Sequence, residues 1–450
     1  MRLLHRKRKR SKEMYNAYIT TIRDLRKHSN ADRLQCATIF GNNVIVDLSY
    51  QVGQRVIYFP VDGQLSEEFA KANNLVRIKD ENGNNTGGYL DPDKRNITAL
   101  KLRGEKSDGL VLPIKVLEPY VDINTLVDGQ QISELNGHLI CRKYIPRRQA
   151  AKTTGGNGKY KDKRKPEDKV NYPFFKEHID TAQLAYNQGA FRPGDTCYIT
   201  LKMHGTSART ANTIEVRRKP TRFYHHLFRT KPKETRHYSC VSGTRRTTLR
   251  NYDGGYYGSN AFREQYHAML RDRLPKGMCV FYEIVGWIDE SKTIMGRCSN
   301  KLVKDKEFTK QYGDETVFSY GCDIGKSDIY VYRMTMSNED GYEVEIPWEQ
   351  VKIECEKMGV KCVPEFEKFI FTTWEDLMER VEKYYDGADP IGKTHVREGV
   401  VVRIDNREHF TAYKHKNFSF KVLEGIIKDT ADAPDIEEAE EQMTNDVQDE

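Results

Sequence analysis

The interpretation of this chain depends on one stretch, Thr196-Cys-Tyr-Ile-Thr-Leu-Lys-Met-His-Gly-Thr-Ser207. Its first half, up to Leu201, has the β-branched and aromatic residues of a buried strand. Lys202 follows at the predicted strand end, next to His204, the turn residue Gly205 and two hydroxyl side chains. A lysine at a strand end is usually just solvated. A functional role for Lys202 is therefore supported only together with residues further along the chain.

Two later apolar runs each contain one carboxylate, Glu283 in Cys279-Val-Phe-Tyr-Glu-Ile-Val-Gly286 and Glu398 in Arg397-Glu-Gly-Val-Val-Val-Arg403. A carboxylate inside a buried strand is costly unless it has a partner. Lys414 and Lys416 are two residues apart on a predicted strand, so they project from one face. A candidate lysine nucleophile, two buried carboxylates and a lysine pair together predict a phosphate site that can also bind a divalent metal.

The length and the charge of the whole chain indicate how many domains it has and what kind of partner it binds. Its 450 residues favour two to three domains. The net charge is +7, but the segment 430–450 contains nine acids and no Lys or Arg, so residues 1–429 carry +16. A basic body with an acidic tail predicts a polyanionic partner. With no apolar run of membrane length and no signal peptide, we expect a cytoplasmic protein without a membrane partner.

The nine cysteines predict buried free thiols rather than disulfides or zinc ligands. Their number is odd, and none are spaced as Cys-x-x-Cys. The adjacent His225 and His226 lack the spacing of a metal-binding pair.

The chain divides into five predicted parts. Residues 14–146 contain short strands between turn signals, which suit a small β-barrel, and residues 147–171 are rich in Lys and Arg with almost no apolar residue, which suits a linker. Strands are mixed with helices in residues 172–429, with helices expected over 261–274 and 374–385, which predicts an α+β domain dominated by sheets. A basic tail, residues 1–13, and the acidic tail, residues 430–450, complete the chain.

These motifs, in this order, resemble the covalent nucleotidyltransferase superfamily of polynucleotide ligases and mRNA-capping enzymes. The resemblance spans roughly residues 172–421. Lys202-Met-His204-Gly205-Thr is similar to the nucleophile motif of the RNA ligase 2 branch, where His replaces the more common Asp. The other matching segments are Phe281-Tyr-Glu283, Phe318-Ser-Tyr320-Gly-Cys-Asp-Ile324, Glu398-Gly-Val-Val and Lys414-His-Lys416.

The resemblance implies a role for each matching residue. Lys202 is the nucleophile that becomes AMP-lysine, Lys414 and Lys416 assist at the α-phosphate, and Glu398 binds Mg²⁺ or Mn²⁺. The remaining matches imply nucleotide binding, with Glu283 on the ribose, Tyr320 stacked on adenine, and His204, Gly205 and Arg245 nearby. Arg246 fits the arginine motif as well as Arg245 does, and Phe318 competes with Tyr320 as the stacking residue.

The implied fold is an N-terminal OB-like barrel, similar to that of Deinococcus-type RNA ligases, followed by an ATP-grasp-like nucleotidyltransferase domain of antiparallel sheets with flanking helices. The implied function is ATP-dependent joining of RNA 3′-OH and 5′-phosphate ends in RNA repair, by a monomer of phage origin that acts on RNA ends or nicked duplexes. A capping guanylyltransferase and a non-catalytic nucleic-acid-binding protein are the alternatives. Only 34 residues follow Lys416, which disfavours the C-terminal domain typical of capping enzymes.

One basic segment has no counterpart in these motifs. Residues 217–236 contain eight Lys or Arg and one acid, with Phe223, Tyr224 and Phe228 between them. Basic residues around aromatics suit contact with phosphates and stacking on bases, although a solvated basic hairpin fits equally well.

Overall fold

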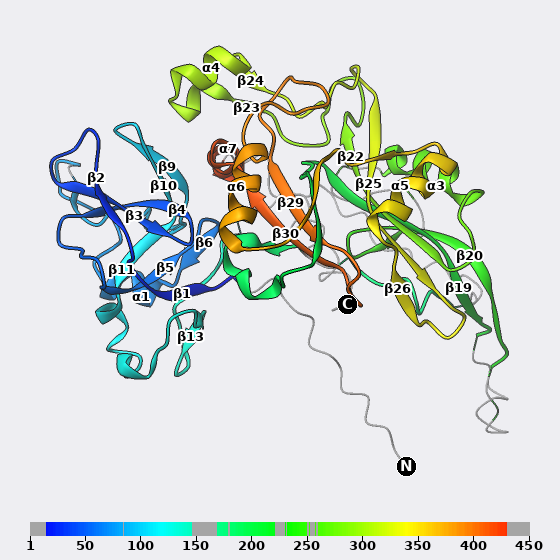
Figure 1. The fold of residues 1–450 in the computed structure, drawn as a ribbon, viewed down its shortest axis with the longest axis horizontal. Coiled ribbons are helices and arrows are strands. Elements are labelled where there is room, and N and C mark those ends of the chain that lie inside the picture. The colour runs from blue at the N-terminus through cyan, green and yellow to red at the C-terminus, as the bar shows by residue number, and fades with distance from the viewer. Residues whose placement is uncertain are drawn as a thin grey trace, which may run out of the picture. The chain divides into compact units, whose positions relative to one another are not determined.

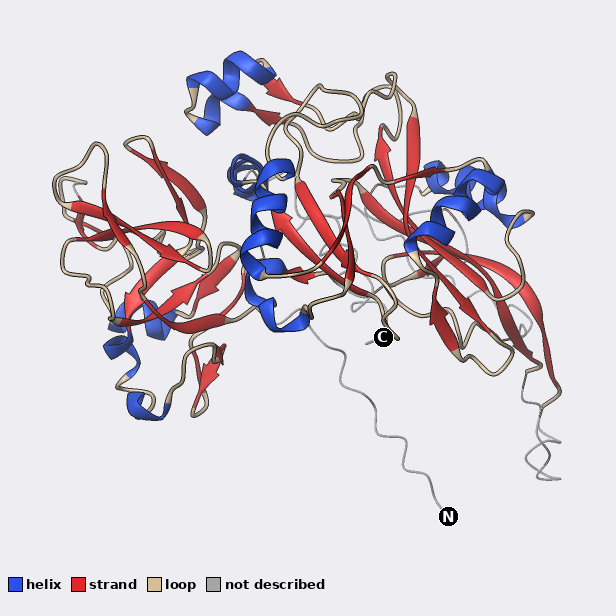
Figure 2. Ribbon diagram, viewed as in Figure 1, coloured by secondary structure: helices blue, strands red, loops and turns tan. Residues whose placement is uncertain are grey.

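The computed structural model describes residues 15–83, 85–145, 169–178, 181–220, 230, 232–249, 252, 257 and 260–429. These residues form two compact units (Figures 1 and 2). Unit 1 contains the described residues up to 145 together with 421–429, and unit 2 contains the described residues between 169 and 420. The predicted N-terminal tail, the acidic tail and most of the predicted linker lie outside the described residues.

Unit 1 is built from short strands with a single described α-helix between residues 15 and 145. Its elements are β1 (Ala17–Thr21), β2 (Leu25–Lys27), β3 (Leu34–Ile39), β4 (Asn42–Asp47), β5 (Arg55–Phe59), β6 (Gly63–Leu65), α1 (Glu67–Ala72), β7 (Ile78–Lys79), β8 (Asn85–Gly87), β9 (Ala99–Leu102), β10 (Glu105–Asp108), β11 (Leu110–Pro113), β12 (Gln131–Ile132), β13 (Glu134–Leu135), β14 (His138–Leu139) and β15 (Cys141–Lys143). One core contains Ile19 of β1, Ile57 and Phe59 of β5, and Phe69 of α1.

The predicted closed barrel of unit 1 is not confirmed. Its strands pair as a four-stranded sheet, β11-β5-β1-β12, a three-stranded sheet, β2-β3-β4, and several two-stranded ribbons. Among the described strands, no pairing joins these sheets into one closed barrel. Many of the strands have only two to four residues.

Unit 2 consists of two large sheets, as expected for a sheet-dominated α+β domain. The first follows the order β21-β20-β19-β22-β25-β26, with β16 paired to β19 and β27 paired to β25. Its strands are β16 (Lys169–Asn171), β19 (Thr206–Arg218), β20 (Glu234–Thr244), β21 (Thr248–Leu249), β22 (Met278–Gly286), β25 (Ser327–Ser337), β26 (Glu343–Glu345) and β27 (Lys361–Cys362). Every residue of β22 is buried, because this strand lies in the middle of the sheet.

The second sheet of unit 2 has the order β17-β30-β29-β18-β28. Its strands are β17 (Ala182–Gln183), β18 (Thr196–Leu201), β28 (Glu365–Ile370), β29 (Gly399–Ile404) and β30 (Thr411–Lys416). Leu377 and Val381 of α6 (Trp374–Tyr384) pack in one core with Val400 and Val402 of β29. This contact places α6 against the sheet (Figure 1). The remaining elements are β23 (Cys298–Ser299), β24 (Glu315–Thr316), α3 (Ala261–Arg271), α4 (Lys306–Tyr312), α5 (Trp348–Met358) and α7 (Phe418–Asp429).

Residues 169–171 differ from expectation, since they form β16 rather than part of the linker. They pair antiparallel with 216–218 of β19, a strand of 13 residues of which only 206–211 pair with β22. The rest of that edge of β19 exposes backbone groups that need partners, and β16 supplies some of them.

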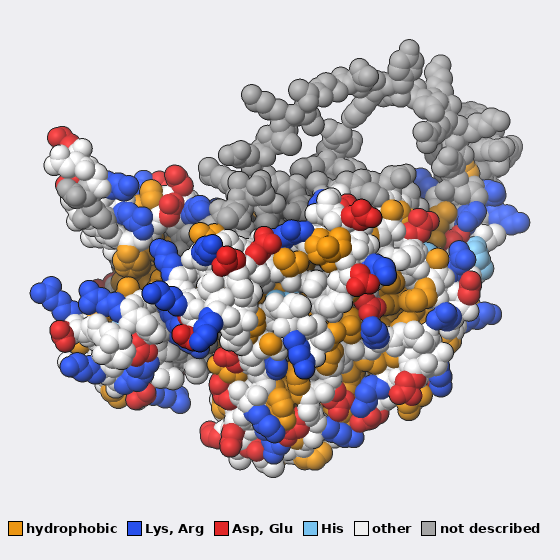
Figure 3. All heavy atoms as spheres, turned by 90° about the horizontal axis from the view of Figure 1, so that it is seen from above, with side chains coloured by type: hydrophobic (Ala, Val, Ile, Leu, Met, Phe, Trp, Pro, Cys, Tyr) orange, Lys and Arg blue, Asp and Glu red, His pale blue; other side chains and the backbone are white. Residues whose placement is uncertain are grey.

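On the face drawn in Figure 3, basic and acidic side chains are intermixed. No helix of the described chain is long and apolar enough to cross a membrane.

Candidate active site at the end of β18

Lys202 directly follows β18, where the strand passes between β28 and β29. Its backbone N–H donates a hydrogen bond to the Gly399 carbonyl at 3.0 Å. The side chain retains 23% exposure, and its Nζ lies 2.9 Å from Glu398 Oε1. The lysine is therefore fixed at its backbone, while its side chain stays partly exposed.

Glu398 is almost fully buried at the start of β29, with 3% of its side chain exposed. Besides Lys202, it lies near Lys416, whose Nζ is 3.4 Å from the same carboxylate oxygen. A buried carboxylate needs such partners because its desolvation is costly. Lys202, Glu398 and Lys416 thus form one charged cluster, although they come from three separate strand ends.

Gly399 allows β29 and β30 to approach closely enough for this cluster to form. Its φ is +143°, and a Cβ atom there would lie 2.1 Å from the His415 carbonyl oxygen. Gly399 pairs with Lys416 and Val401 with Lys414, so the two lysines project from the same face of β30. Any larger residue at 399 would push Lys416 away from Glu398.

Glu283 reaches the site from the other sheet of unit 2. It pairs with Ser207 across β22 and β19, and Ser207 Oγ donates a hydrogen bond to Glu283 Oε2 at 3.0 Å. Burial raises the pKa of Glu283 to about 7, and the charge of Glu398 adds to the rise, while Lys202, Ser207 and Arg245 act in the opposite direction. Since these electrostatic effects are short-ranged, Glu283 belongs to the same site as Lys202.

Gly205 provides the close approach between β19 and β22. A Cβ atom at this position would lie 2.4 Å from the Ile284 carbonyl oxygen and 2.9 Å from Glu283 Cγ. Glycine at 205 is therefore required by the packing beside Glu283.

His204 and Tyr320 support the loop that carries Lys202. His204 Nδ1 lies 3.7 Å from Glu398 Oε2, and its ring packs edge-on against Phe318 and Phe420. The His204 backbone N–H donates to the Tyr320 hydroxyl at 2.6 Å. Tyr320 is 3% exposed, so its ring has little surface to offer a ligand. The geometry does not favour Tyr320 as a stacking residue.

Tyr332 of β25 was not predicted from the sequence. It is more exposed than Tyr320 and therefore better suited to face a ligand. It is half-buried, and its pKa is raised by burial and then by the charge of Glu283. Its ring lies 5.1 Å from that of His178 in an edge-on arrangement. The alternation of Tyr330 and Tyr332 opposite a motif carboxylate could have pointed to this strand.

Arg245, rather than Arg246, interacts electrostatically with the titratable side chains around Glu283. Its charge lowers the pKa values of Glu283, Tyr332 and His178. The Arg245 carbonyl accepts a hydrogen bond from the His178 N–H at 3.1 Å. These effects favour Arg245 as the arginine of the site.

Arg263 of α3 is a second residue that sequence reasoning missed. It is 1% exposed, and its guanidinium donates to Thr206 Oγ1 at 2.7 Å and to the Ser207 carbonyl at 3.0 Å. A buried arginine inside a helix carries no motif, so only the structure reveals that it fixes the start of β19.

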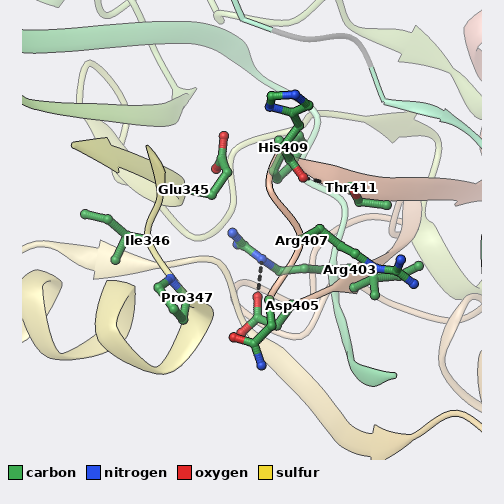
Figure 4. A pocket seen from close by; sticks show the side chains of 11 residues that line it. Glu345, Ile346, Pro347, Arg403, Asp405, Arg407, His409 and Thr411 are labelled. Carbon is green, nitrogen blue, oxygen red and sulfur yellow. Dashed lines mark hydrogen bonds and ion pairs between the residues drawn. The ribbon is translucent and has the colours of Figure 1, made fainter. Parts of the chain in front are cut away.

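The pocket in Figure 4 is separate from this cluster. It is lined by residues around the turn from β29 to β30, including Arg403, Asp405, Arg407 and His409, and by Glu345. Its volume of about 30 Å³ suits one or two water molecules rather than a nucleotide. It lies beyond Ile404, whereas Glu398 and Gly399 mark the opposite end of β29.

The donor set for a cation is small. No group of three or more His, Cys, Asp or Glu side chains is arranged to bind a metal within the described ranges. One buried carboxylate, Glu398, suits Mg²⁺ or Mn²⁺ only if phosphate oxygens and waters complete its coordination, which is the usual arrangement at nucleotide sites.

Comparison with known proteins agrees with this arrangement. The family model described as RNA ligase matches residues 195–423, which is more than half of the chain. A comparison with curated proteins gave no match.

Three solved structures illustrate the similarity in fold, and all are of Naegleria gruberi RNA ligase. A mutant with ATP and Mn has a TM-score of 0.54 and 15% identity, covering 90% of this chain and 98% of that one. A mutant with AMP and Mn gives 0.53 and 16%, with 90% and 97% covered. The protein with PPi gives 0.52 and 15%, with 90% and 97% covered. The chain is therefore similar in fold to that protein.

Proposed function

The chain belongs to the RNA ligase family, and from that premise we propose that it uses ATP to join RNA 3′-OH and 5′-phosphate ends. The observation that carries the proposal is the position of the partly exposed Lys202 side chain beside Glu398, which also has Lys416 as a partner. The reaction has three steps. Lys202 Nζ attacks the α-phosphorus of ATP and pyrophosphate leaves, the AMP moves to an RNA 5′-phosphate, and a 3′-OH then displaces AMP.

The lysine pair on β30 suits the first step, in which Lys202 attacks phosphorus as a neutral amine. Lys416, with Lys414 on the same face of β30, offsets the negative charge that develops on the α-phosphate. Glu398 would hold a divalent cation together with the phosphates, and that cation would supply further positive charge.

The nucleoside part of ATP is assigned to Glu283, Tyr332 and Arg245. An ionised Glu283 accepts hydrogen bonds from ribose hydroxyls, and Arg245 compensates charge beside it. Tyr332, rather than Tyr320, stacks on the adenine, because Tyr320 is buried with its hydroxyl bonded to the His204 N–H. His204 and Gly205 shape the loop that presents Lys202.

We assign RNA binding to unit 1 as an OB-like platform, since short-stranded β units of this kind commonly bind single strands and ends. On this proposal the protein acts as a cytoplasmic monomer on RNA ends or nicked duplexes, in RNA repair.

The first prediction tests the nucleophile and the nucleotide together. Wild-type protein incubated with α-labelled ATP should carry the label through a denaturing gel, and Lys202→Ala should carry none. Lys301→Ala, which removes an exposed lysine paired with Asp314, is the matched control and should label normally.

Two results would contradict the proposal. Labelling of Lys202→Ala would remove the nucleophile assignment. Labelling by GTP but not ATP would favour a capping-type guanylyltransferase, and no labelling by either would favour a non-catalytic RNA-binding protein.

A further inference from the structure

The β19–β20 hairpin continues well beyond the sheet to which it belongs (Figure 1). β19 pairs with β22 only as far as Ala211, whereas its pairing with β20 runs on to Arg218 opposite Glu234. We define the distal arm as residues 213–219 and 233–239 together with β16. The arm is part of unit 2.

The base of the distal arm is held by Glu215, which is 3% exposed. Its Oε2 accepts from the Tyr172 hydroxyl at 3.0 Å, and its Oε1 accepts from Arg217 Nη2 at 2.8 Å. β16 adds backbone pairing along the outer edge. The arm is therefore a structured ribbon whose basic side chains stand in defined positions.

The exposed part of the distal arm is strongly basic. Two acids, Glu215 and Glu234, face six exposed basic residues, which are Lys169, Arg217, Arg218, Lys219, Lys233 and Arg236. Glu234 fixes two of these residues, with Arg218 Nη2 at 2.8 Å and Arg236 Nε at 3.4 Å. Since two carboxylates cannot neutralise six cations, the arm keeps a net positive charge.

Lys219 and Lys233 make the strongest case for an anionic partner. The Lys219 N–H donates to the Lys233 carbonyl at 3.0 Å, so the two side chains stand opposite each other across the ribbon. Like charges directly opposite on paired strands destabilise the pair. A phosphate bound between them would replace this repulsion with two attractive contacts.

We propose that the distal arm binds the phosphate backbone of the RNA that flanks the join, which rests on the RNA ligation proposed above. From Ser207 at the site to Lys219 there are 12 residues of strand, about 40 Å at roughly 3.3 Å per residue. That length corresponds to about a dozen base pairs at the roughly 3.4 Å rise of B-form DNA, and to somewhat more in an A-form RNA duplex, whose rise is shorter. The arm therefore binds substrate far from the reacting ends and extends the footprint along the RNA.

The test compares Lys219→Gln/Lys233→Gln with wild-type protein. The matched control is Lys301→Gln/Lys326→Gln, which removes two exposed lysines elsewhere in unit 2. The measurements are RNA affinity as a function of salt, for duplexes with flanks of about 6 and about 20 base pairs, and AMP labelling in parallel.

For the long duplex, the arm variant should lose about 1.4–1.8 from the slope of log affinity against log salt and about 10- to 30-fold in affinity at 0.15 M salt. The short duplex should be bound equally by all three proteins, and AMP labelling should not change.

A salt slope equal to that of the control would overturn the proposal, and so would the same loss on both duplexes. If the wild-type protein failed to label with ATP, the ligase proposal would fail, while the binding measurements would still decide whether the arm contacts RNA.

Discussion

At the residue scale, the site depends on carboxylates that water scarcely reaches. Glu398 is stabilised by two lysine amines within 3.4 Å. Burial disfavours the ionised form of Glu283 and raises its pKa to about 7, and the hydrogen bond from Ser207 Oγ offsets only part of this rise. The two carboxylates therefore differ in their surroundings, because Glu398 has two lysine partners while burial dominates at Glu283.

Glu283 should make the folded protein less stable as the pH rises. Its ordinary pKa is 4.5, so between about 4.5 and 7 the folded state binds more protons than the unfolded state. The free energy of unfolding must then fall with increasing pH over that window, by about 3 kcal/mol in total. Glu283→Gln cannot ionise and should remove this fall, so the variant should gain on wild-type protein at pH 8 but not at pH 4. Denaturant unfolding at both pH values measures the difference, and parallel changes in the two proteins would rule out a raised pKa.

Two aromatic residues show what local sequence does not specify at this scale. Tyr320 lies in a matching motif, and in the structure its hydroxyl accepts from the His204 N–H and its ring is buried. The alternation of Tyr330 and Tyr332 in β25 is a local signal, but it does not separate a core aromatic from a ligand-facing one. The exposure of Tyr332 depends on how β25 pairs with β22, and a single sequence does not contain that register.

At the scale of elements, the prediction from sequence was more complete. Strands were expected around Lys202, Glu283, Glu398 and Lys414, and β18, β22, β29 and β30 are found there. Helices were expected near 261–274 and 374–385, where α3 and α6 are found. These elements have strong apolar patterns or long periodic runs, which local sequence specifies well. The very short strands of unit 1 do not, and their expected closure into one barrel is the part that the structure did not confirm.

The contact from α3 to β19 should matter for activity as well as for folding. Arg263→Lys keeps the positive charge but removes the guanidinium group, which donates hydrogen bonds to both Thr206 and Ser207. Ser207 would then hold Glu283 less firmly, so AMP labelling should slow by about 10- to 100-fold, and its pH dependence should shift upward as the pKa of Glu283 rises. Arg271→Lys, an exposed position on the same helix, is the control. A slower reaction with an unchanged pH profile would reduce Arg263 to a purely structural role.

At the scale of the whole molecule, the chain returns to unit 1 after completing unit 2. Residues 421–429 of α7 group with unit 1, where Lys421 Nζ lies 2.5 Å from Asp108 Oδ2. The predicted domain 172–429 stays a prediction, and its boundary was drawn from composition alone. The apolar face of a helix does not specify in local sequence which core it packs against.

The division into units predicts that ATP chemistry and end joining can be separated. A chain that begins at Lys169 keeps β16 and every residue assigned to adenylylation, so it should still form lysyl-AMP, within about tenfold of the full-length rate. It should close a pre-adenylated RNA nick at least about 100-fold more slowly, because closure requires two ends to be held in line and the platform for them is removed.

Full-length Lys202→Ala should show the opposite behaviour, with no labelling but continued closure, since the last step needs no lysine nucleophile. Single-turnover rates of both reactions test this reciprocity. Loss of both activities in the shortened chain would mean instead that unit 2 cannot fold without the partner that residues 421–429 find in unit 1.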